Sequence, residues 1–208
     1  MTELYLVKTS ELEIDETILF TFPKERQKRI RQALKVEKAK QLYASTLLLK
    51  RVLNRYEKTL EDVKIDSFGK PYISGMYFNS SHSGSYVALA ISAEEVGVDI
   101  QEQASISPMA AQLFLGENHE DSTYIWCRKE AFLKCVGCGW NDKDASCQSV
   151  MNSEIVYQNS SYFLRDINVL ENYNLSICEK NKRHDFSIKE VSKNELSNPN
   201  FIENERKK

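Results

Sequence analysis

The spacing of apolar residues predicts a well-defined helix over residues 126–134. One stripe of this helix carries Ile125, Phe132 and Val136 at helical spacing. Another face carries Trp126, Glu130 and Lys134, each four residues apart, and side chains at that spacing touch. Glu130 and Lys134 therefore form either a surface ion pair or a general base held by a cation.

The pattern elsewhere predicts a mixture of helices and strands. After Pro23 we expect a long helical region over residues 24–56, basic in its first part (24–40) and amphipathic in its second (41–56). Partial alternation and β-branched or aromatic residues predict strands at 3–8, 63–66, 86–92, 96–100, 154–157, 162–167, 173–178 and 186–188. The first of these is expected at the edge of a sheet.

The connections carry their own signals. Small polar residues ending in Gly84 predict a tight loop over 79–84. Residues 93–95 predict the turn of an antiparallel hairpin that pairs 86–92 with 96–100. We further expect a short helix at 108–115, the end of the central helix at Gly137, and a frayed polar tail from residue 194.

Composition limits the classes of protein that fit. The 208 residues are 41% hydrophobic and 28% charged, which is ordinary for a soluble chain of one large or two small domains. A net charge of -2 gives no global field for nucleic acid or membrane. The start lacks a signal peptide, no apolar run approaches the length of a membrane span, and five cysteines argue against a disulfide scaffold. We expect a cytoplasmic protein.

Asp99 is the second carboxylate with a candidate role, because it ends the apolar strand at 96–100. A carboxylate in such a place is costly unless it is paired, hydrogen-bonded or bound to a metal. Asp99 either caps a turn or joins Glu130 in a magnesium site, since Mg²⁺ uses one or two carboxylates together with water and substrate phosphates.

Phosphate contacts are the other candidate chemistry. His82 either satisfies backbone groups of its loop or contacts a phosphate, and Lys70 is either a surface turn lysine or a second phosphate ligand. The basic run is either a solvated helix face or a phosphate site. Its cations are Lys24, Arg26, Lys28, Arg29, Arg31, Lys35, Lys38 and Lys40. The cysteines at 127, 135, 138 and 147 lack the paired spacing of a structural zinc site.

Four motifs in this order resemble those of the 4′-phosphopantetheinyl transferases, and more narrowly those of the monomeric, double-length class whose type member activates surfactin synthetase. The matching residues are Phe68-Gly-Lys-Pro71, Phe78-Asn-Ser-Ser-His-Ser83, Gly97-Val-Asp-Ile100, and Trp126-x-x-Lys-Glu-Ala131 with Lys134 and Gly137-x-Gly139. The similarity spans roughly residues 20 to 140. Each motif alone is weak, and the four together are specific.

The resemblance implies a reaction: the phosphopantetheine arm of coenzyme A moves to a serine of an apo acyl or peptidyl carrier protein, and 3′,5′-ADP is released. It implies Mg²⁺, or Mn²⁺ in its place, held by Asp99, Glu130 and Gln101. Glu130 would take the serine proton, and Lys134 would orient Glu130 or contact phosphate. Trp126 would be packing. The residues implied in coenzyme A binding are Lys70, Pro71, Ser81, His82, Lys28 and Lys40.

The resemblance also implies an α+β fold and a protein that acts as a monomer. Two similar halves, each an antiparallel sheet with helices, would be related by a pseudo-twofold axis, with coenzyme A in the cleft between them. The halves would be residues 1–98 and 99–208.

The chain departs from the family pattern at three places. The usual Asp-x-Glu of the metal strand is Asp99-Ile-Gln101 here, so Gln101 would offer a neutral amide oxygen. Gln41 stands where an arginine is usual, and the segment between Asp99 and Trp126 is short. A non-catalytic protein that binds coenzyme A or a carrier protein is therefore the alternative, and a zinc-stabilised interaction module is a third.

Overall fold

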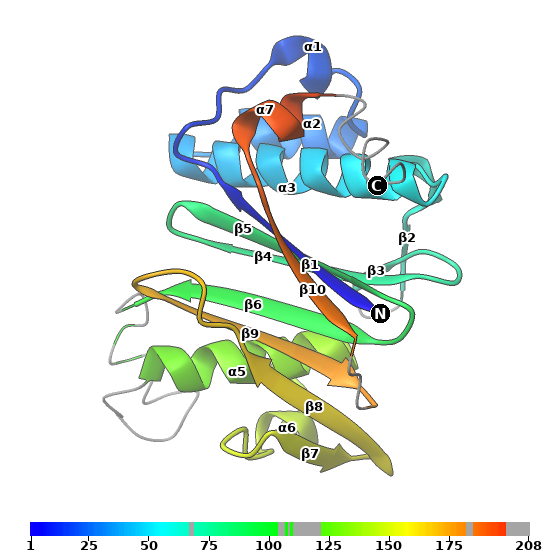
Figure 1. Ribbon diagram of the computed structural model, residues 1–208, viewed down its shortest axis with the longest axis vertical. Helices are drawn as coiled ribbons and strands as arrows, with labels where there is room; N and C mark the ends of the chain where they lie inside the picture. The colour runs from blue at the N-terminus through cyan, green and yellow to red at the C-terminus, as the bar shows by residue number, and fades with distance from the viewer. Residues whose placement is uncertain (67–68, 104–106, 108, 110–121, 182–184, 199–208) are drawn as a thin grey trace.

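The chain folds into two four-stranded sheets with helices on their outer sides, which confirms the α+β class (Figure 1). The computed structural model describes residues 1–66, 69–103, 107, 109, 122–181 and 185–198. The predicted helix at 108–115 lies outside these residues, apart from residue 109. Within the described part of the chain, none of the helices combines the length and apolar character that a membrane span needs.

The first sheet has the strand order β10-β1-β5-β4. Its strands are β1 (Thr2–Lys8), β4 (Tyr77–Ser83), β5 (Tyr86–Ser92) and β10 (Phe186–Val191). The prediction of an edge strand at 3–8 is wrong, because β10 from the end of the chain pairs with β1 in parallel and covers its outer side. Residues 2–7 are accordingly all buried.

The second sheet is antiparallel throughout, in the order β6-β9-β8-β7. It consists of β6 (Val96–Glu102), β7 (Glu154–Tyr157), β8 (Ser160–Asp166) and β9 (Tyr173–Lys180), close to the predicted segments. The predicted hairpin between 86–92 and 96–100 is wrong. The chain crosses between the sheets at 93–95, and apolar residues on the facing sides of both sheets pack together.

Strand β5 instead forms its hairpin with β4, and the predicted loop at 79–84 is mostly strand. Gly84 makes the turn with φ of +48°. The positive φ favours glycine, and a Cβ there would lie 2.3 Å from the Tyr173 hydroxyl oxygen, so that side chain would have to move. Small polar residues occupy β4 because Asn79, Ser81 and Ser83 bond to groups of β6.

The helices cover the two outer faces (Figure 1). On the first sheet lie α1 (Glu16–Leu19), α2 (Lys24–Arg31), α3 (Val36–Arg55) and α7 (Lys193–Ser197). The expected helical region over 24–56 consists of two helices, and the second begins at Val36 rather than at residue 41. Residue 194 does not begin a frayed tail, because Ser192 and Glu195 form a capping box and Leu196 is fully buried. Residues 199–208 lie outside the described part.

Helix α5 (Ser122–Val136) covers the second sheet together with α6 (Lys143–Ser146). A 3₁₀ turn (Leu60–Asp62) and the short strands β2 (Lys64–Ile65) and β3 (Pro71–Tyr72) complete the described elements. Each sheet thus has one long helix on its outer face. Both ends of the described chain belong to the first layer, because β10 and α7 return to the first sheet. The division into halves 1–98 and 99–208 stays a prediction.

Candidate functional site

The candidate site lies where strands β4 and β6 run side by side at the junction of the two sheets. Backbone hydrogen bonds between them are replaced by side chains: the Val98 amide donates to Asn79 Oδ1 at 3.0 Å, and the Glu102 amide donates to Ser83 Oγ at 2.9 Å. Asn79, Ser81 and Ser83 therefore point toward β6. Alternation along β4 turns Phe78, Ser80 and His82 to the opposite face.

Gly97 brings helix α5 into direct contact with β6. A Cβ at this position would lie 2.1 Å from the Ala131 carbonyl oxygen and 2.4 Å from the Cys135 amide nitrogen. Those are backbone atoms that a side chain cannot push aside without moving the helix. The glycine therefore fixes the distance between α5 and the strand that carries Asp99.

Asp99 is buried in this contact, with 1% of its surface exposed, and faces α5 rather than a turn. Its Oδ1 lies 2.5 Å from Lys134 Nζ and accepts a hydrogen bond from Ser81 Oγ at 2.6 Å. Its Oδ2 accepts from Gln101 Nε2 at 2.8 Å. The donors come from α5, β4 and β6, so the carboxylate is compensated by parts of both sheets.

Lys134 holds a second carboxylate, because its Nζ also lies 3.8 Å from Glu130 Oε2. Burial alone would lower the pKa of Lys134, but the Asp99 and Glu130 carboxylates outweigh burial and raise it. The ammonium therefore stays charged and lies between the two carboxylates. Glu130 and Lys134 do not form the isolated surface pair that the sequence left open, since Asp99 joins them.

The other oxygen of Glu130 is held by a residue that the sequence analysis did not single out. Trp140 Nε1 donates to Glu130 Oε1 at 2.5 Å, and the Trp140 ring packs on Trp126 with 4.9 Å between the ring centroids. The signal that could have pointed to it is an aromatic residue directly after Gly137-x-Gly139. A chain that reverses there returns along the helix face that carries Trp126 and Glu130.

The Gly-Lys-Pro segment lies beside these carboxylates. Lys70 Nζ donates to the Cys135 carbonyl oxygen at 2.7 Å, close to the end of α5. Lys70 and Pro71 line one hollow together with Glu130 and Lys134. Phe68, from the same motif, lies outside the described residues.

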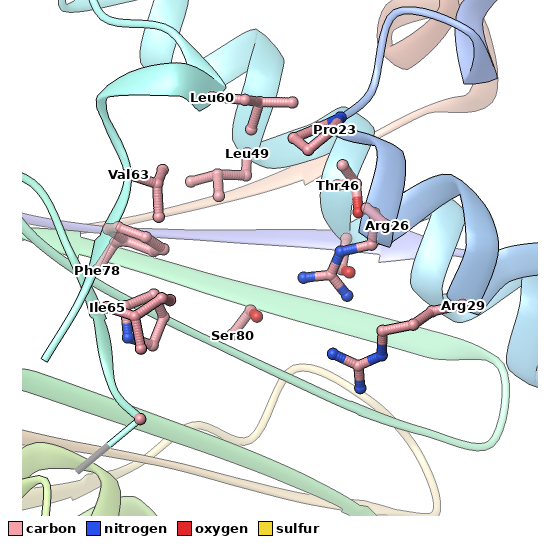
Figure 2. Close-up of a pocket in the computed structure, with 13 residues that line it drawn as sticks. Pro23, Arg26, Arg29, Thr46, Leu49, Leu60, Val63, Ile65, Phe78 and Ser80 are labelled. Carbon is pink, nitrogen blue, oxygen red and sulfur yellow. The ribbon is translucent and has the colours of Figure 1, made fainter. Parts of the chain in front are cut away.

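A larger pocket, of about 260 Å³, opens on the other face of β4 (Figure 2). Its apolar wall is formed by Leu49, Leu60, Val63, Ile65 and Phe78, with Pro71 also in the lining. Figure 2 shows the Arg26 and Arg29 side chains reaching into it across from that wall. The pocket therefore combines an apolar surface with two guanidinium groups, which suits a ligand with a planar apolar part and phosphates.

Lys28 and Lys40 do not line this pocket. Lys28 lines a separate hollow with Phe20, Lys24 and Arg31, and Lys40 Nζ donates to the Ser10 carbonyl oxygen at 3.2 Å. The residues of the basic run that do reach the site are Arg26, Arg29 and Lys38. Helical spacing could have identified Arg26 and Arg29, because they flank the buried positions Gln27 and Ile30.

His82 connects the basic run to strand β4. Its Nε2 lies 2.9 Å from Lys38 Nζ, so this nitrogen accepts and the ring is neutral in this contact. Burial, and then the Lys38 cation, lower the pKa of His82. The imidazole and the ammonium are placed to share an anion.

Asp99 and Glu130 are two carboxylates beside one ammonium group, and Mg²⁺ sites that also bind substrate phosphates use one or two carboxylates. Asp99 and Glu130 already share one cation, and two carboxylates are enough for such a site. Among the described residues, no group of three or more His, Cys, Asp and Glu side chains could hold a metal. Gln101 turns its amide nitrogen, not its oxygen, to Asp99, and its role as a metal ligand stays a prediction.

All five cysteines belong to the described part of the chain and are free thiols. Cys127 is fully buried in α5 and donates to the Asp99 carbonyl oxygen at 3.1 Å. Burial, and then the Asp99 charge, raise the pKa of its thiol well above the ordinary value. Cys127 therefore acts as a small packing residue behind the site.

The chain is similar in sequence to several bacterial 4′-phosphopantetheinyl transferases. The chain is 23% identical over 218 residues to the 4′-phosphopantetheinyl transferase Sfp of Bacillus subtilis (strain 168). That match covers 93% of this chain and 97% of the relative. It is 27% identical over 209 residues to the 4′-phosphopantetheinyl transferase gsp of Aneurinibacillus migulanus, covering 86% of each. No family model matches the chain.

A third relative is matched over a shorter stretch. The chain is 28% identical over 148 residues to the 4′-phosphopantetheinyl transferase ffp of Bacillus subtilis. That match covers 62% of this chain and 66% of the relative, slightly less than two thirds of its length.

Proposed function

Since this chain is a relative of the 4′-phosphopantetheinyl transferases and thus an enzyme of that transferase type, we propose that it transfers the 4′-phosphopantetheine group of coenzyme A. The acceptor is a serine of an apo acyl or peptidyl carrier protein, and the released product is 3′,5′-ADP. Strand β4 is the observation that carries the proposal. On one face of β4, Ser80 and His82 point toward the side that carries the pocket with Arg26 and Arg29 and the Lys38 ammonium. On the other face, Ser81 points toward the Asp99–Lys134 pair.

The pocket of Figure 2 is the proposed site for the nucleotide end of coenzyme A. Its apolar wall and Pro71 would contact the adenine. Arg26, Arg29 and His82 would contact the 3′-phosphate, with Lys38 beside them. Lys28 and Lys40 lie away from this pocket, so their contacts with coenzyme A rest on the resemblance alone.

The reacting groups lie on the other side of β4. The serine oxygen of the carrier forms a bond to the phosphorus that bears the pantetheine arm. The bond from that phosphorus to the bridging oxygen breaks, and 3′,5′-ADP leaves with the electron pair. Glu130 takes the serine proton, directly or through one water molecule, while Lys134, Lys70 and Ser81 neutralise and orient the pyrophosphate.

Asp99 and Glu130 would hold Mg²⁺ or Mn²⁺ beside the pyrophosphate, with Gln101 as the third protein ligand. A divalent ion bound there supplies neutralisation of negative charge on the phosphate oxygens. Lys134 compensates part of the charge of these two carboxylates from the protein itself, because its ammonium lies against both.

The wider arrangement follows from the same proposal. The two sheets, each with one long helix on its outer face, would be the halves of a pseudo-twofold fold, with coenzyme A in the cleft between them. The enzyme would act as a monomer in the cytoplasm, where coenzyme A and carrier proteins meet.

The proposal is tested by incubating the purified protein with coenzyme A, Mg²⁺ and several apo carrier proteins, and measuring release of 3′,5′-ADP by chromatography. We expect release that depends on the carrier and is lost when its acceptor serine is changed to alanine. No release with any carrier, although calorimetry detects binding of coenzyme A, would instead favour the non-catalytic paralogue. The amide nitrogen that Gln101 presents to Asp99 is the observation behind that alternative.

A further inference from the structure

Glu130 is held at both of its carboxylate oxygens, and by different kinds of partner. Oε1 accepts a hydrogen bond from Trp140 Nε1 at 2.5 Å, while Oε2 lies 3.8 Å from the Lys134 ammonium. The indole is a neutral donor with one fixed direction, and the ammonium is a full positive charge that Asp99 also holds. The two oxygens of Glu130 are therefore not equivalent.

The turn after α5 explains how Trp140 reaches this carboxylate. Gly137 and Gly139 have φ of +86° and +64°, conformations that reverse the chain at the end of a helix and favour glycine. The chain then returns along the helix, and the indole of Trp140 packs on the ring of Trp126 at a tilt of 33°. The partly buried Trp140 also packs against the core under α5.

We propose that Trp140 is a positioning residue for Glu130. Its indole N–H binds Oε1, fixes the rotamer of the side chain, and leaves Oε2 as the oxygen that faces Lys134 and the incoming serine. Trp126 holds the indole in place from the same helix face as Glu130, one turn earlier.

The physical reason is the flexibility of glutamate. A free Glu side chain loses rotamer entropy each time it adopts the reactive geometry, and a charge-assisted hydrogen bond made beforehand removes that cost from the reaction step. The contact does not involve coenzyme A or the pocket around Arg29. Loss of the indole donor should therefore lower kcat and leave binding of coenzyme A intact.

This inference rests on the proposed function for its kinetic part, so the contact itself is tested without any substrate. In a protein with ¹⁵N-labelled tryptophan, the Trp140 indole proton bound to a carboxylate resonates downfield. A Glu130→Gln change should move this signal upfield, because an amide oxygen is a weaker acceptor. If the chemical shift of the Trp140 indole proton is the same in Glu130→Gln as in the wild-type protein, the inference is overturned.

The kinetic role is tested with Trp140→Phe, which keeps an aromatic ring on Trp126 and removes the donor. We expect kcat to fall about tenfold, and the KM for coenzyme A to stay within about twofold. Benzothienylalanine at position 140, which replaces only the N–H by sulfur, should give the same loss and keeps the packing if the phenylalanine variant folds poorly. Unchanged kcat in both variants overturns the positioning role.

Tyr56→Phe is the matched control. It also removes one aromatic donor from a buried carboxylate, that of Glu3, but outside the site. Its kcat should equal that of the wild-type protein. If the wild-type protein transfers nothing, the proposed function fails, while the indole spectrum still decides whether Trp140 holds Glu130.

Discussion

Lys134 and Asp99 form an ion pair between helix α5 and strand β6, with 2.5 Å between Nζ and Oδ1. The carboxylate is almost completely buried, and the ammonium is the only full charge within bonding distance of it among the described residues. Two sheets and the long helix of the second layer meet at this pair. The pair therefore links α5 to β6 and also forms the centre of the proposed site.

Lys134→Met should destabilise the protein strongly, because it leaves Asp99 as a buried carboxylate without its cation. We expect a loss of about 3–5 kcal/mol in the free energy of unfolding, measured in denaturant. Changing Asp99 to asparagine in the same chain should recover part of the loss. Lys8→Met breaks the exposed pair with Glu11 and should cost less than about 1 kcal/mol. Equal losses in the two single variants would contradict the burial argument.

Gly97→Ala should separate helix α5 from β6. The added Cβ would meet backbone atoms of Ala131 and Cys135, so the helix has to move. We expect a loss of about 3 kcal/mol or more in unfolding free energy, at the upper end of overpacking effects. Gly75→Ala is the control, since it meets open space and carries only the cost of a positive φ, about 1 kcal/mol. A milder effect at Gly97 than at Gly75 would be inconsistent with the close contact.

His82 should make stability depend on pH near neutrality. Its folded-state pKa is lowered from 6.5, by burial first and then by Lys38, so below pH 6.5 the unfolded chain binds this proton more readily than the folded protein. The stabilisation is therefore present above pH 6.5 and is lost as pH falls through the lower folded pKa.

His82→Gln should flatten the decrease in unfolding free energy between about pH 7 and pH 5, measured by denaturant titration at each pH. The same measurement on His119→Gln and His184→Gln corrects for the other two histidines. The same slope in His82→Gln as in the wild-type protein would show that His82 titrates normally.

Gln101→Glu should increase the affinity for Mg²⁺. It adds a third carboxylate beside Asp99, and carboxylate charge is what binds hard divalent ions most strongly. We expect a Kd for Mg²⁺ about tenfold lower in calorimetry without coenzyme A. Gln103→Glu adds the same charge two residues further along, at an exposed position, and should change the Kd little. Equal Kd values for Mg²⁺ in the two variants would show that Gln101 is not part of the metal site.

Helix α5 and the residues it presents could be predicted from the sequence, since the apolar stripe and the four-residue spacing of Trp126, Glu130 and Lys134 are local signals. Most strands of the second sheet could be predicted from local pattern too, whereas the α+β class was implied by the resemblance to the family. The motifs around Lys70, His82 and Asp99 also identified the family of the relatives.

Long-range pairing could not be predicted in this way. Apolar runs at 86–92 and 96–100 fit one hairpin as well as two packed sheets, because strands with two covered faces lose their alternation. The polar residues of 79–84 predict a loop, but Asn79, Ser81 and Ser83 instead bond to backbone amides and to Asp99 of β6, a partner that local pattern does not contain. Trp140 was missed because its contact with Glu130 depends on the reversal at Gly137 and Gly139.

The central claim is that the pocket on one face of β4 binds coenzyme A and that the groups on its other face move the phosphopantetheine arm to a carrier serine. The most direct test is the intact mass of an apo carrier protein after incubation with coenzyme A, Mg²⁺ and either the wild-type protein or Glu130→Ala. We predict a carrier heavier by one phosphopantetheine group with the wild-type protein, and an unchanged carrier with the variant although calorimetry shows that it binds coenzyme A. Equal modification by both proteins, or none by either across several carriers, would contradict the account.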